Sequence, residues 1–189
     1  MKRLFIGIPI ESDIAAKEAG IWRNDRLLNQ NRMNWVSKEN WHVTLYFLGN
    51  TEESGIELLQ QLIRQSFSSF QAFRTHLNGV GVFPHEQNPK VLWAGLENLE
   101  NLMPNYTKLG DLLAAFGFPF DSKPLKPHLT LARIKSLSHR DSFEAFIKQY
   151  QSFRFGAVTI DRVVLFESIS TPNGPVYKPL FTKWMTMDW

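Results

Sequence analysis

The amino-acid sequence predicts an α+β fold that consists of two similar lobes. Stretches that alternate between apolar and polar residues, as strands do, occur among stretches with the helical period. A His-apolar-Thr-apolar pattern occurs twice, at His42–Leu45 and at His128–Leu131. Each copy is followed by a predicted helix and a predicted pair of strands at similar spacing. An internal duplication explains this order, so we expect a pseudo-twofold axis with the two patterns at the junction of the lobes.

The chain begins with a predicted strand and a predicted helix. Leu4–Ile8 is a short apolar run typical of a buried strand, and the proline that follows ends it. Ser12 is a suitable N-cap for a helix over residues 13–28. The residues that predict the buried face of this helix are spaced seven apart: Ile14, Ile21 and Leu28.

The first His strand lies between a loop and a second helix. A polar loop over residues 29–34 leads to this strand, and Gly49–Thr51 ends it. Two further strands are predicted at 73–83 and 90–96, joined by a turn-rich loop. The helix between them and the first His strand has an apolar stripe formed by Ile56, Leu59, Leu62, Ile63 and Phe67.

The second half of the chain repeats these elements. A helix starts near Pro104, which a first helical turn tolerates, and stops at Gly117. The second His strand comes next, followed by a helix over residues 138–150. The remaining strands are predicted at 153–155, 158–166 and 176–181.

Length and composition limit the class of protein. The chain has a suitable length for one compact bilobal domain, which we expect to span residues 1–189. The formal net charge of +3 suits an anionic ligand but falls short of the basic surface of proteins that bind duplex nucleic acid. The absence of cysteine excludes disulfides, thiol catalysis and Cys-based metal sites.

The apolar run near the N-terminus does not indicate export or a membrane anchor. This run, Leu4–Ile10, is too short for a signal peptide and is followed by acidic residues. No stretch approaches the roughly 20 apolar residues of a membrane span. We therefore expect a soluble, cytoplasmic protein without membrane contact. We also expect a monomer with no obligate protein partner.

The repeated pattern has the residue types of an acid/base site. Alternate side chains of a strand share a face, so His42 lies beside Thr44 on one strand, and His128 lies beside Thr130 on the other. Histidine accepts or donates a proton near neutral pH. One imidazole can deprotonate a water that attacks phosphorus while the other protonates the leaving oxygen, and the hydroxyls can donate hydrogen bonds to the phosphoryl oxygens. The pattern thus predicts metal-free cleavage of a reactive phosphodiester, such as a cyclic phosphate.

Three other interpretations compete with this one. A single His-x-Thr on a strand is usually structural, although two copies at equivalent positions are a much stronger signal. Two histidines also suit a metal site, but catalytic zinc has three protein ligands and neither His strand contains Asp or Glu. We therefore expect no metal and no cofactor. The third interpretation is a nucleotide- or RNA-binding module that has the cleft but no catalytic activity.

Two extended motifs and several shorter stretches match a known family. The extended motifs are His42–Gly49 and Pro127–Arg133. The shorter stretches are Arg3–Ile8, Trp35–Val36, Glu39–Asn40, Val91–Trp93, Ser168 and Gly174–Tyr177. With these residues the chain resembles the two-histidine phosphoesterase superfamily, and within it the RNA 2′,3′-cyclic phosphodiesterases once described as 2′-5′ RNA ligases. The resemblance covers nearly the whole chain.

This resemblance implies both a fold and a reaction. The fold is bilobal and α+β, with antiparallel-rich sheets, helices packed outside and a central cleft. The reaction is metal-independent hydrolysis of RNA 2′,3′-cyclic phosphate ends to a 2′-phosphate, together with reversible 2′-5′ RNA ligation. His42 and His128 are then the acid/base pair, with His128 serving the incoming water and His42 the leaving 3′-oxygen, while Thr44 and Thr130 hold the phosphate. A small cyclic nucleotide or the cyclic phosphate of ADP-ribose is the alternative substrate.

Arg133, the last residue of the second motif, requires a separate argument. Strict alternation places its side chain on the face of the strand opposite His128 and Thr130. Arg133 reaches the cleft only if the strand bends or ends there. In the cleft, a guanidinium can pair with a phosphate or stack on a base. Because it belongs to the family motif, we expect Arg133 to bind substrate.

Overall fold

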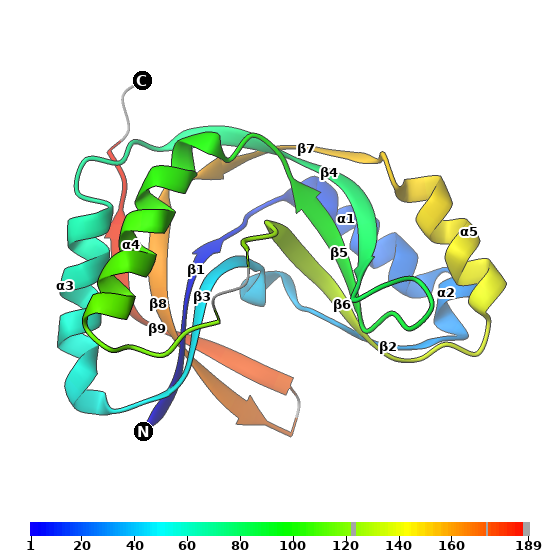
Figure 1. Ribbon diagram of the computed structural model, residues 1–189. Helices are drawn as coiled ribbons and strands as arrows, with labels where there is room; N and C mark the ends of the chain where they lie inside the picture. Colours follow the sequence, from blue (N-terminus) through cyan, green and yellow to red (C-terminus); the bar gives the residue numbers. More distant parts are fainter. Residues whose placement is uncertain (122–123, 173, 187–189) are drawn as a thin grey trace.

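The molecule consists of two antiparallel sheets, and helices cover their outer sides (Figure 1). The computed structural model describes residues 1–121, 124–172 and 174–186. Within these ranges, no helix is both long enough and apolar enough to cross a membrane. The α+β class and the two-lobed arrangement predicted from the sequence are confirmed. That residues 1–189 form one domain stays a prediction.

The four-stranded sheet has the order β3-β1-β8-β9. The strand β1 lies in its interior, and all of Leu4–Ile8 is buried, which explains the uninterrupted apolar run there. The strands of this sheet are β3 (His42–Thr51), β1 (Lys2–Pro9), β8 (Arg162–Thr171) and β9 (Gly174–Trp184).

The five-stranded sheet has the order β2-β6-β5-β4-β7. The prediction of a strand over residues 73–83 coincides with β4, and the second His strand is β6. The strands of this sheet are β2 (Arg32–Trp35), β6 (His128–Ser136), β5 (Val91–Leu96), β4 (Phe73–Phe83) and β7 (Arg154–Ile160).

The two sheets correspond when each is followed from its His strand. The order β3-β1-β8-β9 then matches β6-β5-β4-β7, and β2 is an addition beside β6. The two His strands occupy equivalent positions and approach each other where the sheets meet. This correspondence is the structural form of the duplication that the sequence predicts.

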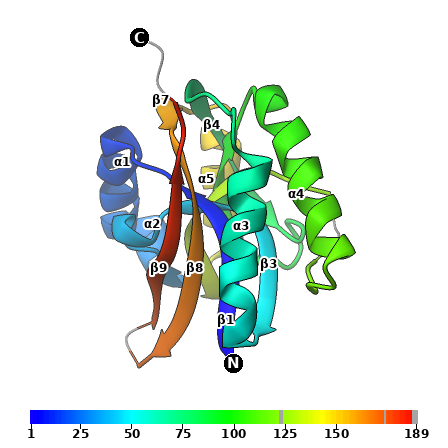
Figure 2. The same cartoon turned by 90° about the vertical axis from the view of Figure 1, so that its left-hand side faces the viewer.

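The helices form two groups on the outside of the molecule (Figure 2). The helices α3 (Ile56–Ser66) and α4 (Met103–Ala115) pack against each other over the four-stranded sheet. The helices α1 (Asp13–Asn24), α2 (Arg26–Asn29) and α5 (Arg140–Tyr150) lie on the five-stranded sheet.

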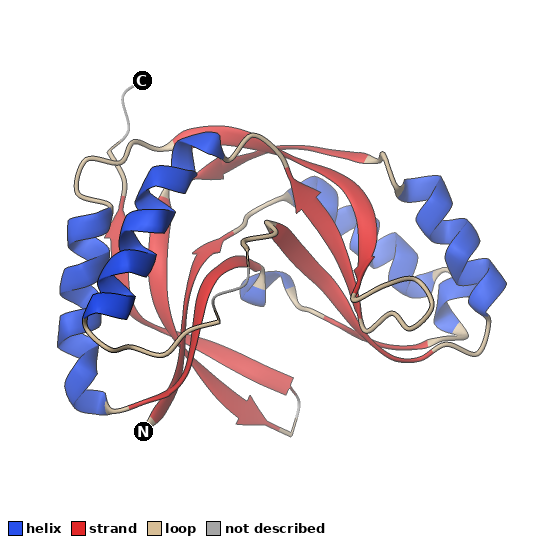
Figure 3. Ribbon diagram, in the orientation of Figure 1, coloured by secondary structure: helices blue, strands red, loops and turns tan. Residues whose placement is uncertain are grey.

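The chain passes repeatedly from one sheet to the other (Figure 3). Successive strands change sheet between β1 and β2, between β2 and β3, between β3 and β4, and between β7 and β8. Each sheet is therefore built from both halves of the sequence. The cleft lies between two layers that share one continuous chain.

The buried face of the first helix differs from the one predicted. Ile14 and Ile21 are 50% and 52% exposed, whereas Ala15, Ala19 and Trp22 are buried. These three residues follow the helical spacing i, i+4, i+7, and the indole of Trp22 packs against the rings of Phe146, Tyr150, Phe153 and Phe155. Burying one indole with two small neighbours brings the helix closer to the sheet than the two isoleucines would.

The predicted helix over residues 13–28 is two helices. Asp25 between them has an extended backbone, with φ −64° and ψ 130°. Its carboxylate accepts a hydrogen bond from the backbone N–H of Leu28, at 3.2 Å, and so caps α2. The predicted loop over 29–34 is also wrong in part, because Arg32–Trp35 forms β2 and pairs with β6.

The break between the last three strands also differs from the prediction. The sequence places a gap at Gly156-Ala157, but β7 continues through it and ends at Ile160. Gly156 has φ +96° beside a register shift between β4 and β7, which is a bulge that only glycine accommodates readily. The strand therefore bends at Gly156 instead of ending.

We predict that Trp22→Ala lowers the free energy of unfolding by about 3–5 kcal/mol, because it leaves a cavity among four aromatic rings. The matched control is Ile21→Ala on the next residue of the same helix, which is half exposed and should change stability by no more than about 0.5 kcal/mol. Denaturant unfolding of both variants tests the helix orientation. Equal losses, or a larger loss for Ile21→Ala, would contradict this orientation of the helix.

Candidate active site

The first His strand directs a polar pair into the cleft and an apolar pair into the core. Along β3, His42 and Thr44 are half buried, while Val43 and Leu45 are 1% and 5% exposed. The alternation of the pleat separates the two pairs. The apolar side packs under α4, where the Tyr46 hydroxyl donates a hydrogen bond to the carbonyl of Tyr106 at 2.9 Å.

The second His strand has the same pattern of burial. His128 and Thr130 are half buried on β6, and Leu129 and Leu131 are buried. Arg133 of this strand lines the pocket described below. The face of β6 that carries the Arg133 side chain is therefore the face directed toward the cleft.

Both His strands contain a β-bulge one residue after the threonine. In β3, Thr44 pairs with Gly7 and Tyr46 pairs with Ile6, so Leu45 has no partner opposite it. In β6, Thr130 pairs with Trp93 and Ala132 pairs with Leu92, so Leu131 is the extra residue. The extra residue shifts the alternation by one position, so that two successive residues are buried in each strand.

This bulge turns Arg133 toward the cleft. Strict alternation directs its side chain away from His128 and Thr130, and the extra residue Leu131 reverses that direction. Phe47 occupies the equivalent position in β3, five residues after its histidine, and it is likewise turned toward the cleft. Because the sequence alone does not reveal the bulge, it does not predict Phe47 as a cleft residue at all.

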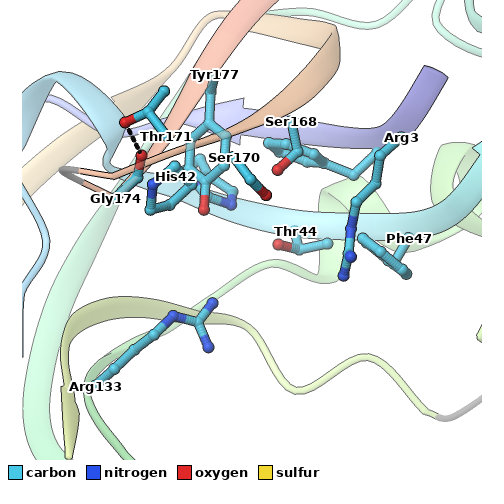
Figure 4. A pocket seen from close by; sticks show the side chains of 12 residues that line it. Arg3, His42, Thr44, Phe47, Arg133, Ser168, Ser170, Thr171, Gly174 and Tyr177 are labelled. Carbon is cyan, nitrogen blue, oxygen red and sulfur yellow. Dashed lines mark hydrogen bonds between the residues drawn. The ribbon is translucent and has the colours of Figure 1, made fainter.

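The side chains meet in a pocket of about 420 Å³ (Figure 4). His42, Thr44 and Phe47 line it from β3, and Arg133 enters from β6 on the other side of the cleft. Its remaining walls are Arg3 and Phe5 of β1 and the β8–β9 hairpin, which contributes Ser168, Ser170, Thr171, Gly174, Pro175 and Tyr177. None of these described lining residues is Asp or Glu.

The structure therefore brings three of the five predicted site residues into one pocket. His42, Thr44 and Arg133 line it. His128 and Thr130 are not among its lining residues, but they lie on the same face of β6 as Arg133. His128 is close enough to His42 for its charge to act on the pKa of that residue. The roles of all five residues stay predictions.

Each imidazole is held in the same way by the backbone. The Nδ1–H of His42 donates to the carbonyl of Asn40 at 2.7 Å, and the Nδ1–H of His128 donates to the carbonyl of Lys126 at 2.7 Å. A carbonyl only accepts, so this bond assigns the proton to Nδ1 in the neutral ring. In both neutral rings Nε2 is then the nitrogen without a proton, and it can accept a hydrogen bond or a proton.

Aromatic rings support both histidines. His42 contacts the rings of Phe5 and Tyr177, with centroids 4.8 and 5.0 Å away. His128 contacts Phe83 edge-on at 4.9 Å, and Phe83 also packs on Trp93. Tyr177 also lines the pocket, whereas Trp35 and Trp93 do not.

Burial makes both histidines weaker bases than usual. It is the main reason that the pKa of His42 and the pKa of His128 lie below the ordinary value of 6.5. The hydrogen bonds to Asn40 and Lys126 oppose this change. The charges of His128 and Arg133 lower the pKa of His42 further.

Asn40 links the pocket wall to the histidine. Its carbonyl holds the His42 ring, and its side-chain amide donates to the carbonyl of Pro175 at 2.9 Å. Pro175 belongs to the part of the β8–β9 hairpin that extends past β1, since β1 pairs with β8 only as far as Glu167. One residue thus positions both the ring and the hairpin.

Potential metal ligands do not cluster in the part of the chain that is described. Residues 1–121, 124–172 and 174–186 contain no group of three or more His, Asp, Glu or Cys side chains close enough to hold an ion. The remaining histidines of the sequence are separate from the cleft lining, and His85 and His139 are exposed.

Comparison with known proteins supports one family. The family model of the 2′-5′ RNA ligase superfamily matches residues 12–171. A Thermotoga maritima protein named RNA 2′,3′-cyclic phosphodiesterase is 33% identical over 180 residues, which is 95% of this chain and 93% of that protein. A protein of the same name from Archaeoglobus fulgidus is 32% identical over 178 residues, which is 94% of this chain and 97% of that protein.

Solved structures share the fold. The crystal structure of a Thermus thermophilus protein superposes with a TM-score of 0.76 at 28% identity and covers 97% of both chains. The crystal structure of E. coli LigT complexed with 3′-AMP superposes with a TM-score of 0.77 over 98% of both chains. The identity to LigT is 22%, so this likeness concerns the fold alone.

We predict that the lowered histidine pKa values make the protein less stable in acid. The unfolded chain binds protons at its histidines below about pH 6.5, before the folded state does, so the free energy of unfolding falls as the pH drops below that value. Replacing both His42 and His128 with Gln should reduce this dependence. Denaturant unfolding at pH 7.5 and pH 5 measures it.

His85→Gln, at an exposed histidine, is the matched control for this experiment. If the double variant retained the full pH dependence of the wild type, the pKa directions of the two cleft histidines would be contradicted.

Proposed function

The chain belongs to the 2′-5′ RNA ligase superfamily, and we propose that it hydrolyses RNA ends that carry a 2′,3′-cyclic phosphate, leaving a 2′-phosphate. Relatives from two distant organisms have the name RNA 2′,3′-cyclic phosphodiesterase and match more than nine tenths of the chain. The same ring opening, with a 5′-hydroxyl as the nucleophile in place of water, joins RNA ends through a 2′-5′ linkage and leaves a free 3′-hydroxyl. We propose this ligation as a second reaction of the same site.

One observation carries the proposal: two histidines on equivalent strands are oriented by the same backbone bond. Each donates Nδ1–H to the carbonyl two residues before it and leaves Nε2 for proton transfer. A general base and a general acid on opposite sides of one phosphorus need this arrangement. A binding module without catalysis has no need of two identically oriented imidazoles.

The reaction follows from the properties of these groups. A neutral imidazole accepts the proton of a water through Nε2 as the water attacks phosphorus. The protonated imidazole donates its Nε2 proton to the 3′-oxygen as the bond between phosphorus and that oxygen breaks. The hydroxyls of Thr44 and Thr130 and the guanidinium of Arg133 stabilise the charge that develops on the phosphoryl oxygens. The product has a free 3′-hydroxyl and a 2′-phosphate.

His128 serves the water and His42 the 3′-oxygen in this proposal. In the free protein, the charges of His128 and Arg133 disfavour a proton on His42. The bound phosphodiester is negative and counteracts both charges, which allows His42 to be protonated in the complex. The assignment therefore depends on bound substrate, and a substrate with an activated leaving group tests it.

The first prediction from this proposal concerns the reaction itself. The purified protein should convert an oligoribonucleotide with a 2′,3′-cyclic phosphate end to the 2′-phosphate, and it should retain that activity after exhaustive chelation. Chromatographic separation of the 2′- and 3′-phosphate isomers measures both points. Activity that chelation abolished and zinc or manganese restored would contradict the metal-free mechanism. Turnover of a small cyclic nucleotide alone would identify the alternative substrate.

The second prediction concerns the two histidines. His42→Ala and His128→Ala should each lower kcat by about 10²–10⁴, the usual contribution of one acid or base. The double variant should be far less than multiplicatively worse, because the two residues act in one step. With an activated aryl phosphodiester, whose leaving group needs no proton, His42→Ala should lose much less than His128→Ala.

His85→Ala is the control for a histidine outside the cleft, and it should keep wild-type rates. If both single cleft variants retained near-full turnover, the two-histidine mechanism would be wrong. If His128→Ala were the variant that the aryl substrate rescued, the roles of acid and base would be exchanged.

A further inference from the structure

Arg3 is a cationic residue of the pocket to which the proposed chemistry gives no role. Its guanidinium lies next to the ring of Phe47, 5.0 Å from the centroid, at the rim of the pocket. Figure 4 shows it on one side of Thr44, with Arg133 on the other. The pocket thus has two cationic ends with the phosphate-holding threonine between them.

The charge of Arg3 has no acidic partner among the described residues. Its neighbour Lys2, on the other face of β1, pairs with Glu167 at 2.9 Å. Arg162 likewise pairs with Glu11 and Asp161. Arg3 makes no such salt bridge within the described ranges, and no described lining residue of its pocket is acidic. An uncompensated guanidinium beside a pocket is suited to an anion that arrives with the ligand.

Phe47 restricts where this guanidinium lies. The contact between a guanidinium and an aromatic face is attractive, and it limits the rotamers of the arginine. Phe47 itself is turned into the cleft by the bulge at Leu45. Ser168 lies near Arg3 in the same pocket and adds a hydroxyl donor (Figure 4). Together these three residues form a site for a second anionic group.

The separation along the strand shows which group that is. In the pairing of β1 with β3, Thr44 lies opposite Gly7, and Arg3 is four residues farther along β1. Four residues of strand separate the Cα atoms by about 13 Å, and the Arg3 guanidinium lies over Phe47, three residues beyond Thr44 on β3. His42 and Arg3 lie on opposite sides of Thr44 in the pocket, so a cyclic phosphate held by His42 and Thr44 lies toward the end away from Arg3 (Figure 4). Arg3 is therefore placed to bind another anion of the same substrate.

We propose that Arg3, held by Phe47 and assisted by Ser168, binds the phosphate on the 5′ side of the terminal nucleotide. This inference rests on the proposed function and names the substrate class within it: RNA ends with an upstream phosphate, in preference to a nucleoside 2′,3′-cyclic phosphate with a 5′-hydroxyl. The phosphate is either the internal phosphodiester of an oligoribonucleotide or a terminal 5′-phosphate. Arg3 acts on binding and leaves the acid/base step unchanged.

The test compares three substrates that share one terminal nucleotide with a 2′,3′-cyclic phosphate. The first has a 5′-hydroxyl, the second a 5′-phosphate, and the third continues as an oligoribonucleotide. For the wild type we expect kcat/KM to be about tenfold or more higher for the two that carry an upstream phosphate, the scale of one charge-assisted contact. A preference for the oligoribonucleotide alone would identify the internal phosphodiester as the natural ligand.

Arg3→Gln should remove this preference, because its loss of kcat/KM should be about tenfold or more larger for the two substrates with an upstream phosphate than for the 5′-hydroxyl substrate. Arg3→Lys should keep part of it, because the charge remains and the planar fork is lost. The matched control is Arg64→Gln on α3, where a guanidinium lies 4.5 Å from the ring of Phe181 outside the pocket. That variant loses the same kind of contact and should retain the preference.

Two results would overturn the subsite. One is an equal loss on all three substrates with Arg3→Gln, which would indicate a structural role for Arg3. The other is no loss on any of them. A wild-type protein that turned over none of the substrates would refute the proposed function instead. In that case the binding of an oligoribonucleotide with a 2′-phosphate end tests the Arg3 subsite separately. Equal affinity of the wild type and of Arg3→Gln for this oligoribonucleotide would contradict the subsite.

Discussion

The pairing geometry of two strands is the constraint on which the site depends. A regular strand presents every second side chain to the cleft. In each motif this alternation would direct the histidine and the threonine to the cleft, and it would direct the side chain five positions after the histidine away from it. The bulges at Leu45 and Leu131 change this by a single unpaired residue. They allow Phe47 and Arg133 to share a face with the His-Thr pair of their own strand, without a loop and without loss of the buried apolar side.

The backbone, and not a carboxylate, orients the histidines. In many acid/base sites an Asp or Glu holds the second ring nitrogen and raises the basicity of the imidazole. Here the carbonyls of Asn40 and Lys126 hold Nδ1, and burial keeps both pKa values low. A neutral carbonyl fixes the tautomer without adding negative charge. A pocket without acidic lining residues avoids repelling a phosphodiester, and it leaves the cations at its ends uncompensated.

How well the sequence predicts each part depends on whether the signal is local. Alternation within β4 and the repeated His-x-Thr are local, so the strand and the identity of His42, Thr44, His128 and Thr130 as cleft candidates follow from period two. The position of Arg133 and Phe47 depends on which residue of β1 or β5 lies opposite, which the sequence does not state. The face of α1 was wrong for a similar reason: the pocket that accepts Trp22 is made by α5 and β7, far along the chain.

The interleaved course of the chain determines how the molecule can be divided. A fragment that ended after β5 would carry β1 and β3 of one sheet and β2, β4 and β5 of the other. It would hold one His motif and two incomplete sheets, and the complementary fragment would hold the other motif and the missing strands. Neither fragment has both His strands, and each exposes the strand edges that the other one covers. Cutting the connection between β5 and α4 therefore yields two pieces that regain the cleft only by reassembling, so that phosphodiester turnover becomes a reporter of their association.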